Sequence, residues 1–315
     1  MKILLTGGAG FIGSHFCEYA LENGHEIVIL DNFNDYYDPA IKRRNVEGFL
    51  GRNDVEIVEG EILDGDLLDK LFEKHNFSGI VHLAARAGVR PSLQQPFLYE
   101  KVNIQGTMEL LERANKYKVE KVVVASSSSV YGKNKKTPFS ESDFVDNPIS
   151  PYAATKKACE LISHTYCHLY DLNVSCLRFF TVYGPRQRPD MAIHKFTKLI
   201  AQGEPIPMYG DGSTKRDYTF ISDIVDGVYR SLMRASGYNV YNLGESKTIS
   251  LSDLIKTIEE KLGKEAIIQR MPMQPGDVEI TYADVTKARE DLGYAPKVNI
   301  ETGIEKFVNW FKSEL

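Results

Sequence analysis

The chain of 315 residues has little cysteine, and its four cysteines, Cys17, Cys159, Cys167 and Cys176, show no CxxC spacing. Cysteines this sparse favour free thiols in a reducing compartment over a disulfide framework. Long apolar runs are also missing, since no stretch approaches the roughly 18 residues needed to span a bilayer. Residues 1–5 are too short for the apolar segment of a signal peptide before glycines interrupt them. These absences predict a cytoplasmic protein that does not contact membranes.

An excess of basic residues is absent as well, because 38 Lys and Arg stand against 43 Asp and Glu, for a net charge of -5. Binding of a polyanion requires a basic surface, so nucleic acid is not an expected partner. With 43% hydrophobic and 26% charged residues, the composition is that of an ordinary globular protein. The length is sufficient for one large domain or two fused domains.

Short apolar runs alternate with helical stretches in the first part of the chain. This alternation is typical of a parallel sheet with helices on both faces, whose strands are buried on both sides. We therefore expect an α/β protein with a Rossmann-type doubly wound parallel sheet. The expected strands are residues 3–6, 26–30, 55–58, 79–83, 121–126 and 174–178.

After Arg178 the alternation gives way to segments rich in proline and glycine, such as Gly184-Pro185 and 272–276. We expect residues 1–178 to form the Rossmann domain and residues 179–315 to form mainly a smaller, discontinuous substrate-binding domain. Segments within about 218–245 are expected to return to the first domain. No stretch has the composition of a linker that would free one domain from the other.

A glycine-rich turn with Gly7, Gly10 and Gly13 connects the first expected strand to a helix over residues 12–23. Gly7 permits the tight turn, Gly10 lets the backbone approach a pyrophosphate, and Gly13 lets helix and strand pack closely. Asp31 ends the second strand, where a carboxylate accepts from the adenosine ribose and repels a 2'-phosphate. This pattern predicts NAD rather than NADP; the alternative is a structural glycine turn followed by a surface aspartate.

Small and polar residues further along the chain fit the other half of the same cofactor. Leu83, Ala84 and Ala85 follow the fourth expected strand, and Asn103 lies in the next stretch. Residues of this size would let the nicotinamide half lie flat. We therefore include all four among the expected NAD contacts.

Tyr152 and Lys156 are four residues apart, so that on a helix both side chains point the same way. A nearby ammonium favours the phenolate, which makes Tyr152 a candidate base. The fifth expected strand carries Ser127, Ser128 and Ser129 at its carboxyl end, where open α/β sheets bind ligands. One serine can pass a substrate proton to Tyr152. A helix surface pair and a serine turn are the alternative readings of these residues.

Taken together, these motifs resemble the extended short-chain dehydrogenase/reductase family, and within it the nucleotide-sugar epimerases that act on UDP-glucuronate. The resemblance covers essentially the whole chain. It is most specific in residues 31–38, 85–90 and 179–192. It implies a catalytic triad of Ser127, Tyr152 and Lys156, with Ser129 also at the reacting hydroxyl. It extends the expected NAD contacts to Phe11, Ile12, Asn32, Glu61 and Ile62.

The implied reaction is 4-epimerisation of a UDP-sugar through a transient 4-keto intermediate, with NAD regenerated in each cycle. Ser128 and Ser129 stand where dehydrating relatives carry Asp-Glu and where decarboxylating relatives carry Glu at the second position. Thr181 stands where galactose-type epimerases carry asparagine. Because hydroxyls suit a negatively charged C5 substituent, UDP-glucuronate is the expected substrate. The alternatives are a 4-epimerase of UDP-glucose or UDP-N-acetylglucosamine, a decarboxylase, and a non-catalytic NAD-binding sensor.

The resemblance also assigns the ends of the substrate. Either Arg188 or Arg90 is expected to pair with the sugar carboxylate, because a guanidinium suits a planar anion. Arg216 matches the diphosphate-binding arginine and Asp277 the residue that holds the uridine ribose. Helices over about 104–117 and 153–170 are expected to form a homodimer. No metal is expected, although His164 and His168 have helical ligand spacing; His82 is expected to be satisfied by backbone at a strand end.

Overall fold

The computed structural model describes residues 1–272 and 278–314. Within these residues seven parallel strands form one sheet, and all six strands expected from the sequence are among them, with ends that differ by at most one residue. The expectation of a Rossmann-type parallel sheet is therefore confirmed. In spatial order the strands are β11 (Tyr238–Leu243), β6 (Asn173–Phe179), β5 (Lys121–Ser127), β4 (Gly79–His82), β1 (Lys2–Thr6), β2 (Glu26–Asp31) and β3 (Val55–Glu59).

Helices cover both faces of this sheet because alternate side chains of each strand point in opposite directions. Ile3 and Leu5 of β1 belong to one apolar core, whereas Leu4 belongs to another. The first core includes side chains of α1 (Phe11–Glu22) and α9 (Ile221–Arg234). The second includes side chains of α3 (Gly65–Lys74), α6 (Gly106–Lys116) and α7 (Pro151–Tyr170). Burial on both faces explains why the strands are almost entirely apolar.

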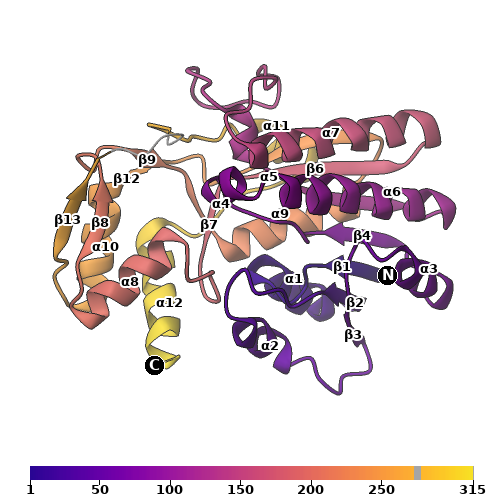
Figure 1. Cartoon of the computed structure of the whole chain (residues 1–315), viewed down its shortest axis with the longest axis horizontal. Coiled ribbons are helices and arrows are strands. Elements are labelled where there is room, and N and C mark those ends of the chain that lie inside the picture. Colours follow the sequence, from indigo (N-terminus) through magenta and orange to yellow (C-terminus); the bar gives the residue numbers. More distant parts are fainter. Residues whose placement is uncertain (273–277, 315) are drawn as a thin grey trace.

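A second group of elements lies beside the central sheet, on the left of Figure 1. Its helices are α8 (Ala192–Gln202), α10 (Leu251–Leu262) and α12 (Ile300–Ser313). Its strands form two short pairs, parallel β8 (Ile206–Tyr209) with β13 (Ile268–Met271), and antiparallel β9 (Lys215–Arg216) with β12 (Ile249–Ser250). Buried Ile193, Leu254 and Phe307 of these helices belong to the same apolar core as Ile3 and Leu5 of β1. The two groups therefore share one core.

The chain passes between these groups more than once. After β6 it forms β7 (Thr181–Tyr183), which pairs with β10 (Tyr218–Phe220), and then α9 leads back to β11 at the edge of the central sheet. The division at residues 178 and 179 remains a prediction. The remaining helices are α2 (Pro39–Glu47), α4 (Val89–Gln94), α5 (Pro96–Tyr99), α11 (Thr286–Leu292), the π-helix η1 (Glu100–Gln105) and the 3-10 helix η2 (Ser128–Tyr131). Among the described helices, none has the length and apolar character needed to cross a membrane.

Candidate active site

A cavity of about 410 Å³ opens at the carboxyl ends of β1, β2, β4 and β5. This edge is where open parallel sheets bind their ligands. Residues from β7 and from the segment before α8 close its other side. The residues expected from the sequence that line it are Gly7, Gly10, Phe11, Ile12, Gly13, Asp31, Asn32, Glu61, Ile62, Leu83, Ala84, Ala85, Ser127, Ser128, Ser129, Tyr152, Lys156, Thr181 and Arg188.

The glycine turn between β1 and α1 leaves no room for side chains. A Cβ atom on Gly13 would lie 2.2 Å from the carbonyl oxygen of Gly7, and Gly7 itself has a φ of +70°. The N-cap of α1 is Gly10, which makes no side-chain capping bond. The N-terminus of this helix therefore presents backbone N–H groups to the cavity without a capping side chain, and it fits the pyrophosphate of a dinucleotide.

Asp31 is positioned by backbone donors before any ligand arrives. Its Oδ2 accepts from the Ala9 amide at 3.1 Å and its Oδ1 accepts from the Phe33 amide at 2.9 Å. Burial raises the pKa of this carboxyl, against the opposing charge of Lys42. A carboxylate has about four acceptor positions, so two remain for ribose hydroxyls. Lys42, buried in α2 and donating to the Asn34 carbonyl, is a cavity residue that the sequence reading missed.

Glu61 and Asn32, which both line the cavity, contact each other. Asn32 Nδ2 donates to Glu61 Oε1 at 2.8 Å. Asn103, in contrast, does not line the cavity. Its Oδ1 accepts from the Arg86 amide at 2.8 Å, and its Nδ2 donates to the Arg86 carbonyl and to Thr155 Oγ1, both at 3.0 Å. Asn103 therefore shapes the turn after β4, and Arg86, which the sequence reading also missed, is the residue that reaches the cavity.

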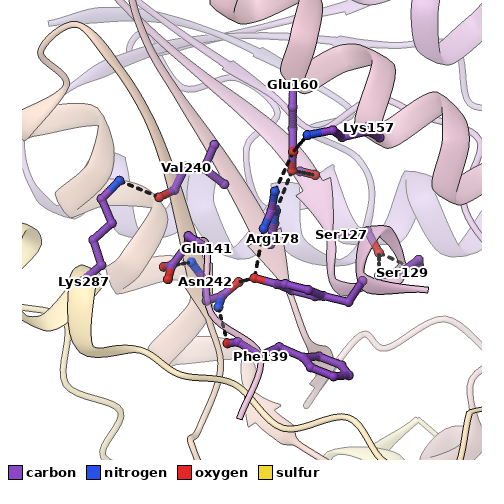
Figure 2. Close-up of polar contacts among 12 residues, drawn as sticks. Ser127, Ser129, Phe139, Glu141, Lys157, Glu160, Arg178, Val240, Asn242 and Lys287 are labelled. Carbon is purple, nitrogen blue, oxygen red and sulfur yellow. Dashed lines mark hydrogen bonds and ion pairs between the residues drawn. The ribbon is translucent and has the colours of Figure 1, made fainter. Parts of the chain in front are cut away.

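The serine run, Ser127 to Ser129, begins at the last residue of β5 and has two hydroxyls in contact. Ser127 Oγ donates to Ser129 Oγ at 3.0 Å and accepts from the Ser129 amide at 3.1 Å. Figure 2 shows these two side chains beside each other at the start of η2. Ser127 is the N-cap of this short helix. The local bonding therefore holds both hydroxyls at the cavity wall, as expected from the sequence.

The helix α7 brings Tyr152 and Lys156 to the same cavity. It begins at Pro151, with Ser150 as the N-cap accepting from the Ala153 amide at 3.1 Å. Lys156 is 5% exposed and its Nζ donates to the Ala125 carbonyl at 2.7 Å. The same Nζ lies 6.0 Å from the centre of the Tyr152 ring. The helix therefore places a buried ammonium near the Tyr152 ring at the cavity.

Of the two arginines expected to pair with the carboxylate, Arg188 is the one that lines the cavity. Its Nε and Nη2 donate to Asp190 Oδ1 and Oδ2 at 2.9 and 2.8 Å, and its guanidinium lies 5.2 Å from the centre of the Tyr36 ring. The loop before it is anchored by buried Gln187, which donates to the Val182 carbonyl and accepts from the His194 amide.

The other predicted substrate residues have different positions. The Arg90 guanidinium lies 4.9 Å from the centre of the Tyr209 ring, and Arg216 in β9 donates to the carbonyl of Lys215 at 2.8 Å. Neither is among the residues that line the cavity. Asp277 lies outside the described residues.

Two tyrosines lie near Arg188 and Tyr152 and were not assigned to the site from the sequence. Tyr36 lines the cavity and faces Arg188, and it falls within residues 31–38, which carried the resemblance without being given a role. Tyr99 packs edge-on against Tyr152, with ring centres 6.2 Å apart, and donates to the Ala87 carbonyl. No pattern in the sequence indicated Tyr99, because its role depends on the fold that brings α5 to α7.

The histidines set aside in the sequence do not form a site. His82 is buried between the hydroxyls of Thr6, 2.7 Å from Nδ1, and Thr107, 3.2 Å from Nε2, so the expectation of backbone partners was wrong. Burial lowers the pKa of His82 to about 3, which leaves it neutral. The ring of His164 meets Tyr238 edge-on. Within residues 1–272 and 278–314, no cluster of His, Cys, Asp and Glu is arranged to hold a metal ion.

Known proteins are similar to this chain over nearly its whole length. Residues 4–307 match the GDP-mannose 4,6 dehydratase family. A UDP-glucuronate 4-epimerase of Thermodesulfobacterium geofontis is 42% identical over 99% of this chain and 96% of its own length. The solved structure of a UDP-glucuronic acid 4-epimerase from Bacillus cereus, in complex with UDP-glucuronic acid and NAD, matches with a TM-score of 0.94 and 36% identity over 100% of both chains.

A second solved structure has the same fold with a different sugar nucleotide. The UDP-glucose 4-epimerase of Thermotoga maritima, solved with UDP-glucose, matches with a TM-score of 0.91 and 33% identity over 100% of this chain and 99% of its own. The matches thus include epimerases of both acidic and neutral sugars. By this similarity and by its seven-stranded sheet, the chain belongs to the GDP-mannose 4,6 dehydratase family, within the extended short-chain dehydrogenases/reductases.

Proposed function

We propose that this protein is an isomerase that converts UDP-glucuronate to UDP-galacturonate by NAD-dependent epimerisation at C4. The observation that carries the proposal is a single cavity that joins three features. A glycine turn fits a dinucleotide, Tyr152 and Ser127 supply acid–base groups, and Thr181 and Arg188 supply anion donors. The full-length similarity to UDP-glucuronate 4-epimerases supports this substrate.

NAD, when bound, supplies the hydride acceptor and donor that let the C4 alcohol pass through a 4-keto sugar and return. The glycine turn, Asp31 and Asn32 would hold its adenosine and pyrophosphate parts. Tyr152 accepts the proton of the 4-hydroxyl and later returns it, directly or through Ser127 and Ser129. Lys156 stabilises the phenolate that performs the first step.

The uronate carboxylate needs donors that hold it still. The 4-keto form of a uronic acid is a β-keto acid, which is prone to lose carbon dioxide when its carboxylate can align for departure. Ser128, Ser129 and Thr181 offer hydroxyl donors, and Arg188 offers the donors that Asp190 leaves free. We place the carboxylate on Arg188 rather than Arg90, because Arg188 lines the cavity and Arg90 does not. Arg216 and Asp277 stay proposed contacts of the diphosphate and the uridine ribose.

The residues at the serine run favour epimerisation over the other reactions of the family. Dehydration requires an acid to protonate the leaving hydroxyl, and Ser128 and Ser129 cannot supply one. A non-catalytic sensor would not need Tyr152 and the buried Lys156 placed together at the carboxyl end of β5. A 4-epimerase of neutral UDP-hexoses remains the second candidate, because the Thermotoga maritima relative has the same fold.

The test is to offer UDP-glucuronate, UDP-glucose and UDP-N-acetylglucosamine separately to the purified protein and to separate the products by chromatography. We expect UDP-galacturonate from the first and much slower conversion of the other two. Equal use of UDP-glucuronate and UDP-glucose would overturn the uronate assignment. Conversion of none of them, with NAD bound, would favour the sensor.

We also propose that the protein is a homodimer that pairs through α6 and α7. On α7, Leu161 and Leu169 are 55% and 63% exposed, and Met108 on α6 is 42% exposed, whereas Ile162 packs against the protein's own core. Exposed apolar side chains on adjacent helices suit a self-complementary interface. Light scattering at micromolar concentration should give twice the chain mass, and Leu161→Glu should reduce it; a monomeric native protein would overturn this proposal. The cytoplasmic location stays a prediction of the sequence.

A further inference from the structure

A buried ion pair joins α7, the helix that carries Tyr152 and Lys156, to β6, the next strand along the chain. Glu160 on α7 and Arg178 on β6 have side chains that are 1% and 3% exposed. Arg178 Nε donates to Glu160 Oε1 at 2.8 Å and Nη2 donates to Oε2 at 2.9 Å. Figure 2 shows the two side chains facing each other in this arrangement. A bidentate pair of this kind fixes the direction of both partners.

Two branches of hydrogen bonds extend from this pair. One leads to β5, and the other leads to η2 and β11. On one side, Ser126 Oγ donates to Glu160 Oε1 at 2.6 Å. On the other, Arg178 Nη1 donates to the Tyr131 hydroxyl at 3.0 Å, and that hydroxyl donates to Asn242 Oδ1 at 2.7 Å. All five side chains are buried. We call these five residues the Glu160 network.

The members of the network are adjacent in sequence to the reacting groups. Ser126 directly precedes Ser127, and Tyr131 follows Ser129 by two residues, at the end of η2. Glu160 is one helical turn beyond Lys156 on α7. The network therefore ties together the backbone segments that carry the catalytic serines and the Tyr152 helix.

Stability alone does not explain a buried pair of this kind. Burying two charges costs solvation, and well-packed apolar residues of the same volume often stabilise a protein equally or better. The best-attested use of a buried polar group is to fix the register of the elements that it joins. Register matters at this point, because a displacement of about 1 Å at a reacting centre can cost on the order of a hundredfold in rate.

We propose that Glu160, Arg178 and Tyr131 are positioning residues that set the distance between the serine run and the Tyr152 hydroxyl. None of the three lines the cavity, so they act through Ser127, Ser129 and Tyr152 rather than on the substrate. The proposal rests on the proton-transfer roles given to those residues under the proposed function.

The test begins with Tyr131→Phe in the full-length protein, which removes the hydroxyl between Arg178 and Asn242 and keeps the ring that stacks on Phe139. We expect kcat for UDP-glucuronate to fall roughly tenfold, while KM stays within about twofold and bound NAD is retained. The matched control is Tyr166→Phe. Tyr166 is a similarly buried tyrosine whose hydroxyl donates to Glu112, near the other end of α7, and kcat should not change.

A second variant, Ser126→Ala, cuts the other branch and changes only one small side chain. If both branches act through the same ion pair, the double variant loses less kcat than the product of the two single losses. A purely structural role would change the melting temperature of Tyr131→Phe, Tyr166→Phe and Ser126→Ala. It would not produce this coupling in kcat.

The outcomes separate the two proposals. Native protein that converts none of the UDP-sugars overturns the proposed function and, with it, the positioning role. Normal conversion by the native protein, with kcat of Tyr131→Phe equal to that of Tyr166→Phe, overturns the positioning role alone. Fully multiplicative losses in the Ser126→Ala and Tyr131→Phe double variant also overturn it.

Discussion

The two walls of the cavity are built in different ways. The cofactor wall depends on backbone, because Cβ atoms on Gly7 and Gly13 would clash with backbone atoms and because Asp31 is held by two amide groups. The substrate wall depends on side chains, since Arg188 is positioned by Asp190, Tyr36 and the loop anchored by Gln187. Backbone geometry tolerates few substitutions, whereas a wall of side chains can be altered one residue at a time. We therefore expect single substitutions in the cofactor wall either to keep NAD binding or to abolish it. Substitutions in the substrate wall should change the preference among sugars gradually.

The largest effect is expected at Tyr152, which lines the same cavity. Tyr152→Phe removes the proposed proton acceptor and keeps the ring that packs against Tyr99, so kcat should fall by about 10²–10⁴-fold. Bound NAD, measured by absorbance and mass after denaturation, should remain. A Phe variant with near-normal kcat would show that the base is another residue.

The backbone nature of the cofactor wall can be tested with two glycine substitutions. Gly13→Ala places a Cβ atom 2.2 Å from a carbonyl oxygen, so NAD should be lost and unfolding free energy should fall by about 1–3 kcal/mol or more. Gly48→Ala, with a φ of -65° and nothing within 4 Å of the new atom, is the control and should be neutral or slightly stabilising. Retention of NAD by Gly13→Ala would contradict the close packing of α1 on β1.

On the substrate wall, Arg188→Ala should lower kcat/KM for UDP-glucuronate by roughly tenfold, as expected for a hydrogen bond to a charged group. Turnover of UDP-glucose should change less. Release of carbon dioxide relative to epimer should rise, because the 4-keto acid is held less firmly. The measurement is product analysis with both nucleotide sugars; an unchanged ratio of the two activities would place the carboxylate elsewhere.

The smallest effect is expected from Thr181→Val, which removes one hydroxyl donor from the same wall. The preference for UDP-glucuronate over UDP-glucose should fall by a few-fold, at or below the low end for a hydrogen bond to a charged group, because the remaining donors still hold the carboxylate. The control is Thr197→Val on α8, whose buried hydroxyl has no hydrogen-bond partner within the described part of the chain. Equal ratios in native protein and Thr181→Val would assign Thr181 to packing alone.

The glycine turn and Asp31 lie at the cavity as the sequence predicted, because local rules describe them, and their contacts with NAD stay a prediction. Apolar runs such as residues 121–126 give strands, and the spacing of Gly7, Gly10 and Gly13 has one physical use at a strand–helix turn. Asn103 is an instructive exception. Its type and position suggested a nicotinamide contact, but its amide is used by Arg86 and Thr155, which no sequence pattern places beside it.

Most of the substrate wall could not be derived from residue patterns. Thr181 and Arg188 were assigned by resemblance, and Tyr36, which faces Arg188, is distant from it in sequence. The contact between Arg188 and Tyr36 joins residues from the two groups of elements and depends on how those groups pack. Hydrophobic periodicity and glycine spacing describe neighbours along the chain, and so they do not report such contacts.

The pairing of Arg188 with Asp190 has a consequence for selectivity. The guanidinium has a tethered counterion, so this corner of the cavity is electrically balanced before a sugar enters. A sugar carboxylate must share the guanidinium with a competitor whose effective concentration is on the order of millimolar or higher. A neutral hydroxymethyl group, conversely, leaves no bare cation behind. Rejection of neutral sugars therefore depends on the uncharged donors of Ser128, Ser129 and Thr181 as well as on Arg188, whose guanidinium orients the acid in addition to attracting it.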